Sequence, residues 1–276
     1  MLGARDVRDL LSKHGLDARR SLGQNFVADP NTVRRIVRLA GVGPGDRVVE
    51  IGPGLGSLTL ALADSGALVT AVEKDHDLVP ILTDVLSERG VSSVSVVEGD
   101  ALTMDWSDLL AGGPWSLVAN LPYNVAVPVV IGLLATAPMV DRLVVMVQRE
   151  VADRLVASPG GRTIGIPSIK VAWFGEARLV AQVSPEVFIP RPRVQSAVVR
   201  IDRRPPPSTV VEPDAVFRLV DIAYRQRRKM LRATLGGDVT AEAFESAGIA
   251  PTARPEELGV ADWARLAEAV SGSVAS

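Results

Sequence analysis

Short apolar stretches alternate with segments of helical periodicity over the first 150 residues of this 276-residue chain. The stretches with strand character lie at residues 47–51, 67–72, 93–97, 116–119 and 142–147. The segments with helical periodicity lie at residues 31–41, 57–65, 77–89 and 127–136. Strands that alternate with helices of this length indicate βαβ units, in which parallel strands form one sheet and helices cover both of its faces. The sequence therefore predicts an α/β fold with a Rossmann-like sheet.

The pattern changes in the second half of the chain, which contains one clear linker. Two more strand-like stretches, at residues 177–183 and 197–201, precede the proline-rich segment Arg203–Ser208. Proline removes a backbone donor and fixes φ, so this segment continues neither a helix nor a central strand. The periodicity beyond the linker is helical, at residues 215–235, 241–247, 255–258 and 261–270. We therefore expect an α/β domain over residues 1–204 and a small all-helical domain over residues 205–276.

Composition narrows the chemistry that the chain can perform. It has no cysteine, which excludes disulfides, thiol nucleophiles and thiolate zinc sites. His14 and His76 are its only histidines, so a histidine-rich metal centre is excluded and we expect no metal cofactor. The formal net charge of −2 argues, taken alone, against a generally basic nucleic-acid-binding protein.

The sequence shows neither a membrane span nor a secretory signal. The longest apolar run, residues 125–140, contains Pro128 and Pro138 and is shorter than the roughly 20 residues that a spanning helix needs. Near the N-terminus, charged residues are not followed by the apolar stretch of a signal peptide. We therefore expect a soluble, cytoplasmic monomer with no membrane partner.

A glycine-rich turn, VVEIGPGLG at Val48–Gly56, follows the first strand of the alternating region. Its glycines allow the backbone to turn tightly and to approach a ligand before the next helix begins. Glu73 ends the second strand, where a carboxylate can bind the ribose hydroxyls of a nucleoside cofactor. Asp100 ends the third strand and is placed to accept from an adenine amino group. The alternative is an ordinary glycine-rich turn with two surface acids.

The spacing of the glycines distinguishes a dinucleotide-binding turn from the turn of another class of nucleoside-binding enzymes. Ser57 stands where a dinucleotide-binding fingerprint would have its last glycine. The pattern E-x-G-x-G-x-G resembles more closely the turn of methyltransferases that use S-adenosylmethionine (SAM), a cofactor with no pyrophosphate to bind.

The motif Asn120-Leu121-Pro122-Tyr123 follows the fourth strand and resembles the N/D-P-P-Y/F motif of methyltransferases that modify exocyclic amino groups of nucleic-acid bases. Such an amine is a poor nucleophile because its lone pair is delocalised into the ring. Acceptors for its N–H groups, here the Asn120 side chain and the carbonyl of Leu121 or Pro122, favour a tetrahedral nitrogen whose lone pair points at the methyl donor. Tyr123 can stack on an extruded base. The alternative is a proline-containing strand exit with a buried tyrosine.

Two later segments contain several arginines, and the first of them also contains a phenylalanine. In VFIPRPRVQS, residues 187–196, an exposed Phe188 would form a second wall opposite Tyr123, and Arg191 and Arg193 would meet phosphates. The alternatives are that Phe188 is buried in the core and that the two arginines lie on a solvated edge of the protein.

In YRQRRKMLR, residues 224–232, helical spacing predicts one basic face that suits backbone phosphates, formed by Arg225, Arg228, Lys229 and Arg232. A solvated charged face is the alternative. Residues 187–235 contain eleven basic and four acidic residues, so the near-neutral total conceals a basic region and does not exclude a nucleic-acid partner. Residues 19–26, RRSLGQNF, form a further basic stretch ahead of a helix.

Together these segments resemble the small-subunit (16S) ribosomal RNA N6-adenine dimethyltransferase family (KsgA/RsmA). The stretches that carry the resemblance are SLGQNF at 21–26, VVEIGPGLGSLT at 48–59, EKD at 73–75, GDAL at 99–102, NLPYNV at 120–125, VFIPRPRVQSAVV at 187–199 and YRQRRKMLR at 224–232. Members of that family transfer methyl groups from SAM, which becomes S-adenosyl-L-homocysteine, to N6 of two adjacent adenosines. These adenosines lie in the 3′-terminal hairpin of 16S rRNA in the 30S particle, and the reaction occurs late in ribosome biogenesis. The resemblance implies the same activity here.

The resemblance also implies a role for each matching residue. The implied cofactor-binding residues are Asn25, Val27, Gly52, Glu73, Asp100 and Asn120. The implied catalytic residues are Asn120, Leu121, Pro122, Tyr123 and Phe188, and the RNA-binding residues are Arg191, Arg193, Arg225, Arg228, Lys229 and Arg232. Val27 stands where leucine is usual and Arg193 where lysine is usual, and both keep the chemical class.

Three other functions compete with this reading. Large-subunit rRNA adenine dimethylases of the macrolide-resistance type belong to the same superfamily, but residues 187–194 and 224–232 look more like the small-subunit branch. A non-catalytic ribosome assembly factor would not need an intact glycine-rich turn, Glu73, Asp100 and the NLPY motif. A nicotinamide-dependent oxidoreductase would leave that motif without a role.

Overall fold

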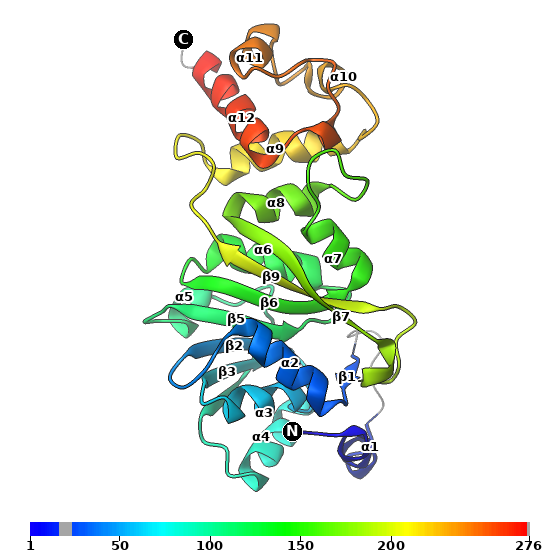
Figure 1. Ribbon diagram of the computed structural model, residues 1–276. Coiled ribbons are helices and arrows are strands. Elements are labelled where there is room, and N and C mark those ends of the chain that lie inside the picture. Colours follow the sequence, from blue (N-terminus) through cyan, green and yellow to red (C-terminus); the bar gives the residue numbers. More distant parts are fainter. Residues whose placement is uncertain (17–23, 275–276) are drawn as a thin grey trace. The chain divides into compact units, whose positions relative to one another are not determined.

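The structure is a computed structural model that describes residues 1–16 and 24–274 (Figure 1). The chain forms two compact units. The first contains Met1–Ala152 and Arg178–Arg203, and the second contains Asp153–Ala177 and Arg204–Ser276.

The expected division at residue 204 differs from the structure in one segment. Residues 153–177, which the sequence pattern assigns to the α/β domain, belong to the second unit. The physical reason is a shared core, because Ile169 and Trp173 of this segment are buried together with the helices that follow the linker. The Trp173 ring also meets Phe217 edge to face, with ring centroids 6.1 Å apart.

The helices and strands before residue 149 all belong to the first unit. In chain order they are α1 (Ala4–Lys13), β1 (Phe26–Val27), α2 (Pro30–Ala40), β2 (Arg47–Ile51), α3 (Ser57–Asp64), β3 (Leu68–Glu73), α4 (Leu78–Glu88), β4 (Val94–Glu98), α5 (Trp106–Leu109), β5 (Trp115–Asn120), α6 (Ala126–Thr136) and β6 (Val140–Gln148). The elements that follow, up to the linker, are α7 (Arg149–Leu155), α8 (Ile166–Phe174), β7 (Gly175–Val183), the 3₁₀ turn η2 (Pro185–Val187), β8 (Phe188–Ile189) and β9 (Ser196–Arg203).

Seven strands form one sheet in the order β4-β3-β2-β5-β6-β9-β7, and β1 pairs with β8 in a separate antiparallel pair. The strands from β4 to β6 are parallel, whereas β9 runs antiparallel to β6. The chain winds outwards in opposite directions from β2 and from β5, so the strand order reverses between these two strands. Ligands of open α/β sheets bind outside the carboxyl ends of the strands at such a point.

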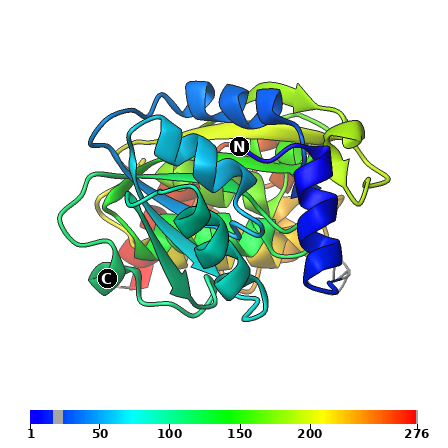
Figure 2. The same ribbon diagram turned by 90° about the horizontal axis from the view of Figure 1, so that it is seen from below.

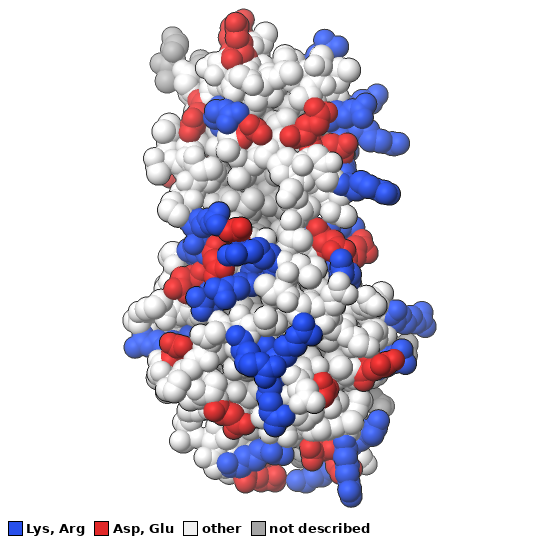
Figure 3. Space-filling model, in the orientation of Figure 1, with Lys and Arg blue, Asp and Glu red and all other residues white. Residues whose placement is uncertain are grey.

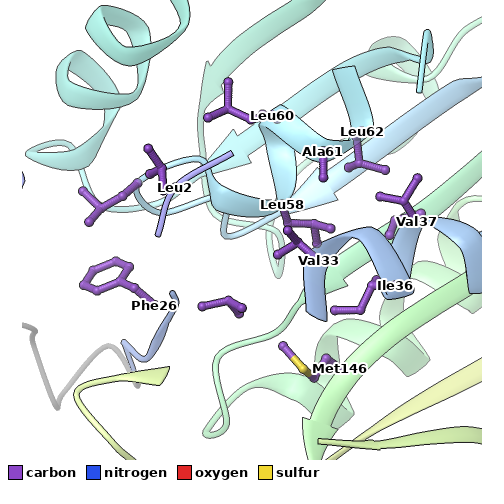
Figure 4. Packing of buried hydrophobic residues seen from close by; sticks show 14 of the residues in the cluster. Leu2, Phe26, Val33, Ile36, Val37, Leu58, Leu60, Ala61, Leu62 and Met146 are labelled. Atoms are coloured by element: carbon purple, nitrogen blue, oxygen red, sulfur yellow. The ribbon is translucent and has the colours of Figure 1, made fainter. Parts of the chain in front are cut away.

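Both faces of the sheet are covered, as predicted for a Rossmann-like fold. Val48, Val118 and Val144 share a core with the buried sides of α2, α3 and α4. Figure 4 shows Val33 and Ile36 of α2 between Met146 of β6 and Leu58 of α3. The alternate strand residues Val49 and Leu117 are also buried but lie outside that cluster, and α6 is behind the sheet where α2 is in front (Figure 1). The predicted fold class is confirmed.

Two elements position the segment that precedes α2. α1, which the sequence pattern does not reveal, lies beside β8 (Figure 2). Asp29 caps α2 by accepting from the backbone N–H groups of Asn31 and Thr32, and Gly41 ends the helix with a φ of 65°.

The second unit is helical apart from the start of β7. The elements after the linker are α9 (Pro213–Tyr224), α10 (Leu231–Leu235), α11 (Ala241–Ser246), the 3₁₀ turn η3 (Pro255–Glu257) and α12 (Val260–Val274). Trp263 is fully buried in the core of this unit. No helix in the described ranges is long and apolar enough to cross a membrane.

The expected continuous helix over residues 215–235 is wrong. α9 ends at Tyr224, and α10 begins only at Leu231. The backbone N–H groups of Leu231 and Arg232 donate to the carbonyls of Ala253 and Pro251, at 2.8 Å and 2.9 Å, rather than to the end of α9. Contacts distant in sequence therefore break the helix, and the predicted basic helical face of residues 225–232 does not form.

Candidate active site

The turn between β2 and α3 lines a pocket at the point where the strand order reverses. Gly52, Gly54 and Gly56 have positive φ values of 69°, 57° and 93°. A Cβ atom on Gly54 would lie 3.0 Å from the ring of Phe26. Backbone conformation and close packing therefore both require glycine in this turn.

Four segments distant in sequence meet at this pocket. They are residues 24–27 around β1, the glycine-rich turn, residues 73–75 after β3, and residues 120–125 after β5. The sequence-predicted residues that line it are Asn25, Val27, Gly52, Glu73, Asn120, Leu121, Pro122 and Tyr123. Most of them follow strand ends at the same edge of a parallel sheet, which brings them together. Asp100 and Phe188 do not line it.

The Glu73 carboxylate is fixed at the wall of the pocket. It is only 6% exposed, and each of its oxygens accepts a backbone hydrogen bond. Oε2 accepts from Gly54 N–H at 3.0 Å, and Oε1 accepts from Asp75 N–H at 2.9 Å. Burial raises the pKa of Glu73, although these hydrogen bonds oppose the rise. A carboxylate has about four acceptor positions, so Glu73 can still accept from a ligand hydroxyl.

Asn120 lines the pocket and carries a buried acceptor without a partner among the described residues. Its Nδ2 donates to the carbonyl of Asn25 at 3.1 Å, which orients the amide. Its Oδ1 is buried and has no hydrogen-bond partner among the described residues. Such a buried acceptor costs about 1–3 kcal/mol, so its place in a binding pocket indicates a ligand that donates to it.

Tyr123 is half-buried beside Asn120 and lines the same pocket. Its hydroxyl forms a hydrogen bond with Ser196 Oγ at 2.7 Å. Burial raises the pKa of the phenol. The hydrogen bond to Ser196 thus fixes the position of the hydroxyl, and the aromatic ring forms part of the pocket wall.

Three further pocket residues are not singled out by the sequence pattern. Gln24 Nε2 donates to Asp75 Oδ2 at 2.7 Å, which joins the segment before β1 to the end of β3. Glu50 is 1% exposed, and burial, with a smaller contribution from the charge of Glu73, raises its pKa to about 8. Glu50 is the first residue of the E-x-G-x-G-x-G pattern, and Asp75 is the last residue of EKD at 73–75, a stretch that carries the family resemblance, so both had a signal in the sequence.

Asp100 does not line the pocket but contacts Lys74, which does. Its Oδ2 accepts from Lys74 Nζ at 2.7 Å, and this hydrogen bond lowers its pKa. Lys74 itself lines the pocket, so the ion pair connects the end of β4 to the pocket edge.

The expectation of an exposed Phe188 opposite Tyr123 is wrong. Phe188 is 2% exposed and belongs to the core of the first unit. Its backbone pairs with Val27 in the small antiparallel sheet, a strand too short for the sequence to reveal. The apolar residues that the segment around β1 contributes to the pocket are Phe26 and Val27.

The sequence-predicted basic residues are all exposed, and they are divided between the two units. Arg191 and Arg193 follow β8 in the first unit, where Arg191 forms an exposed ion pair with Glu186 at 3.5 Å. Arg225, Arg228 and Lys229 lie in the turn between α9 and α10 of the second unit, and Arg232 lies in α10. Residues 19–23 of the basic stretch before β1 lie outside the described residues.

The residues of the pocket fit SAM. SAM carries a positive charge on sulfur, and the described pocket lining includes the buried carboxyl groups of Glu73 and Asp75 together with one lysine, Lys74. Glu50 also lines the pocket, but its raised pKa keeps it protonated near neutral pH, so it adds a polar group and no charge. The carboxyl groups of the described lining are compatible with a positively charged ligand. The turn allows close backbone approach, and Glu73 has acceptor capacity for hydroxyl groups.

Known proteins resemble this chain over nearly its whole length. The family model of ribosomal RNA adenine dimethylases matches residues 15–271. The chain is 51% identical to the ribosomal RNA small subunit methyltransferase A of Kineococcus radiotolerans, over 97% of this chain and 91% of that protein. It is 49% identical to the protein of the same name from Cutibacterium acnes, over 98% of this chain and 95% of that protein.

Solved structures show the same fold. A dimethyladenosine transferase from Plasmodium falciparum has a TM-score of 0.75 at 23% identity, covering 87% of this chain and 95% of its own. The 23S rRNA methyltransferase ErmE has a TM-score of 0.68 at 28% identity, covering 90% of this chain and all of its own. By its sequence, its fold and the residues of its pocket, the chain belongs to the ribosomal RNA adenine dimethylase family and is a SAM-dependent rRNA adenine dimethyltransferase.

Proposed function

We propose that this enzyme dimethylates N6 of two adjacent adenosines in the 3′-terminal hairpin of 16S rRNA within the 30S particle, late in small-subunit biogenesis and in the cytoplasm. The relatives that are about half identical over nearly the whole chain are named for the small subunit. The structure named for 23S rRNA is only 28% identical, so the large-subunit alternative has less support. The observation that carries the proposed chemistry is the buried Oδ1 of Asn120, a residue of the pocket wall, which has no hydrogen-bond partner among the described residues.

Asn120 and its neighbours would activate the target amine. SAM supplies an electrophilic methyl group on a positively charged sulfur. The hydrogen bond from Asn120 Nδ2 to the Asn25 carbonyl holds Oδ1 in place, so that Oδ1 accepts from the amine N–H, as does the carbonyl of Leu121 or Pro122. These acceptors favour a tetrahedral nitrogen whose lone pair is available. The work is mainly positioning, which needs no strong base.

The remaining pocket residues would hold the cofactor and the base. Glu73 would bind the ribose hydroxyls and Gly52 would contact the cofactor through its backbone. Asn25 and Val27 would cover it, and Asp100, held by Lys74, would accept from its adenine amino group. Tyr123 would stack on the extruded target base.

Tyr123 offers a test of base stacking. Tyr123→Ala should lower kcat/KM by roughly 10- to 100-fold, because stacking contributes about 1–3 kcal/mol per base. Tyr123→Phe keeps the ring and loses only the hydrogen bond to Ser196, so its activity should stay within about fivefold of wild type. Steady-state methylation of 30S particles measures the activity of the two variants, and calorimetry checks that each still binds SAM. Equal losses in the two variants would contradict stacking, since they would assign the effect to the hydroxyl.

The basic turn between α9 and α10 offers a test of RNA binding. Arg228→Glu combined with Lys229→Glu should weaken 30S binding and flatten its salt dependence while leaving SAM affinity unchanged, because the two cations would no longer release counterions from phosphates. The matched control is Lys13→Glu with Arg89→Glu, two exposed cations of the first unit. Filter binding at several salt concentrations gives the comparison. If both variants bind like wild type, the RNA-binding surface lies elsewhere.

The choice of ribosomal subunit is tested by methyl transfer from labelled SAM to purified 30S and 50S subunits from cells that lack the endogenous enzymes. Label in 16S rRNA is expected. Label confined to 23S rRNA would replace the proposal with the large-subunit activity, and SAM binding without transfer to either would favour an assembly factor.

A further inference from the structure

The outward face of α2 carries three arginines, Arg34, Arg35 and Arg38, that the sequence-predicted site does not include. The opposite side of this helix is buried, through Val33, Ile36, Val37 and Ala40. The spacing of the arginines places them together on the exposed side, and all three are exposed. Figure 3 shows a group of blue side chains over the position that α2 has in Figure 1.

This arginine face, defined as Arg34, Arg35 and Arg38, is not neutralised by the protein. None of the three forms an ion pair with a described acidic residue, whereas Arg5 pairs with Asp9 and Arg191 with Glu186 elsewhere in the first unit. Arg34 makes one hydrogen bond, of 3.4 Å, to Asn31 Oδ1.

The carboxylate at the start of α2, that of Asp29, already accepts hydrogen bonds from the helix itself. The Asp29 carboxylate accepts from the side chain and the backbone N–H of Thr32 and from the backbone of Asn31, as the helix cap. Burial would raise the pKa of Asp29, but the hydrogen bonds from Thr32 and Asn31 lower it overall, and the charge of Arg34 makes the smallest contribution.

A groove lies beside Arg35. It has a volume of about 150 Å³ and separates α2 from β7, the edge strand of the sheet. Its polar lining comes from Thr32 and Arg35 on the helix and from Gln182 and Ser184 at the end of the strand. Guanidinium, amide and hydroxyl groups along a groove can donate to phosphate and ribose oxygens without reading base sequence.

The basic character continues past the end of the helix. Arg142 and Arg200 donate to the carbonyls of Ala40 and Leu39, the last residues of α2. Both arginines also contact the same carboxylate, Asp202, at 3.3 Å and 2.8 Å.

We propose that the arginine face of α2 and the groove beside it bind the phosphate backbone of the rRNA substrate, as a contact separate from the basic turn of the second unit. This inference rests on the proposed function, which supplies a polyanionic substrate. Exposed arginines without acidic partners repel one another, and a phosphate backbone relieves that repulsion through bidentate, charge-assisted hydrogen bonds. The contact is sequence-independent, so it would contribute to affinity and orientation and not to the choice of adenosine.

The test is the triple variant Arg34→Gln, Arg35→Gln, Arg38→Gln, compared with a control that removes the same charge elsewhere in the same unit. The control is Arg5→Gln, Lys13→Gln, Arg89→Gln, which are also exposed. Binding of each full-length protein to 30S particles is measured from about 50 to 300 mM salt. SAM affinity and thermal unfolding are measured alongside. All the substituted side chains are exposed, so folding should be unaffected.

The triple variant should bind 30S particles roughly 10- to 100-fold more weakly near 0.1 M salt, and its plot of log affinity against log salt should be shallower by roughly 2 to 3. The control and the SAM affinity should match wild type. Equal binding by the triple variant and the control would overturn the inference, as would a loss of affinity with an unchanged salt slope. Absence of methyl transfer by the wild-type protein would instead show that the proposed function itself is wrong.

Discussion

In an Asn120→Ala variant, methyl transfer is expected to fall by at least about 100-fold while the protein stays folded. Losing one preorganised polar contact to a reacting group typically costs about 10²–10³ in kcat. The substitution removes one hydrogen bond, to the Asn25 carbonyl, and an acceptor that has no partner within the described chain. Stability should therefore change by only about 1 kcal/mol. Single-turnover methylation with saturating SAM and 30S particles, together with thermal unfolding, measures both quantities.

Asn120→Asp is the matched control for the role of the acceptor. Aspartate keeps acceptor oxygens at this position but loses the donor to the Asn25 carbonyl. It should therefore retain measurable transfer, well above that of Asn120→Ala. Wild-type turnover in Asn120→Ala would remove the proposed mechanism. Equal inactivity of the two variants would show that the bond to Asn25, rather than the acceptor, is what matters.

The second large effect concerns stability. The free energy of unfolding should fall as the pH rises from about 4.5 to about 8, and Glu50→Gln should remove most of that fall. The pKa of Glu50 is about 8 in the folded protein against an ordinary value of 4.5. Between these values the folded protein retains a proton that the unfolded chain has released, so raising the pH favours unfolding. The difference amounts to roughly 4–5 kcal/mol at high pH.

Urea denaturation at about pH 5, 7 and 8.5 checks this expectation. Wild type and Glu50→Gln should be similar near pH 5 and diverge as the pH rises, with the variant more stable. Glu73, whose pKa is also raised by burial, contributes a further fall of the same sign in both proteins. The control is Glu98→Gln, because Glu98 is exposed on β4. A constant difference between wild type and Glu50→Gln across this range would contradict a buried, protonated Glu50.

The central sheet could be predicted because its signals are local. Residues 47–51 form an apolar run bounded by turn residues, and β2 occupies the same residues. Parallel strands buried on both faces need such runs, and the intervening helices carry amphipathic patterns with end signals. Glu73, Asn120 and Tyr123 could be placed near one another for the same reason, since each follows a strand of that sheet.

The elements that the sequence did not reveal depend on contacts between distant residues. β1 and β8 contain two residues each and exist only because they pair with one another, which buries Phe188. The helix expected over residues 215–235 is interrupted because Leu231 and Arg232 donate to the segment at residues 251–253. The hydrogen bond between Gln24 and Asp75 joins residues that are 51 positions apart, so no local pattern predicts it.

The most direct test of the central claim is a mass-spectrometric map of adenosine methylation. 30S particles from cells lacking the endogenous enzyme are incubated with the purified protein and SAM, and nuclease fragments of the 3′-terminal hairpin of 16S rRNA are analysed. The account predicts two adjacent adenosines, each carrying N6,N6-dimethylation, and no such product with Asn120→Ala. Unmodified adenosines in that hairpin after incubation with the wild-type protein would contradict it.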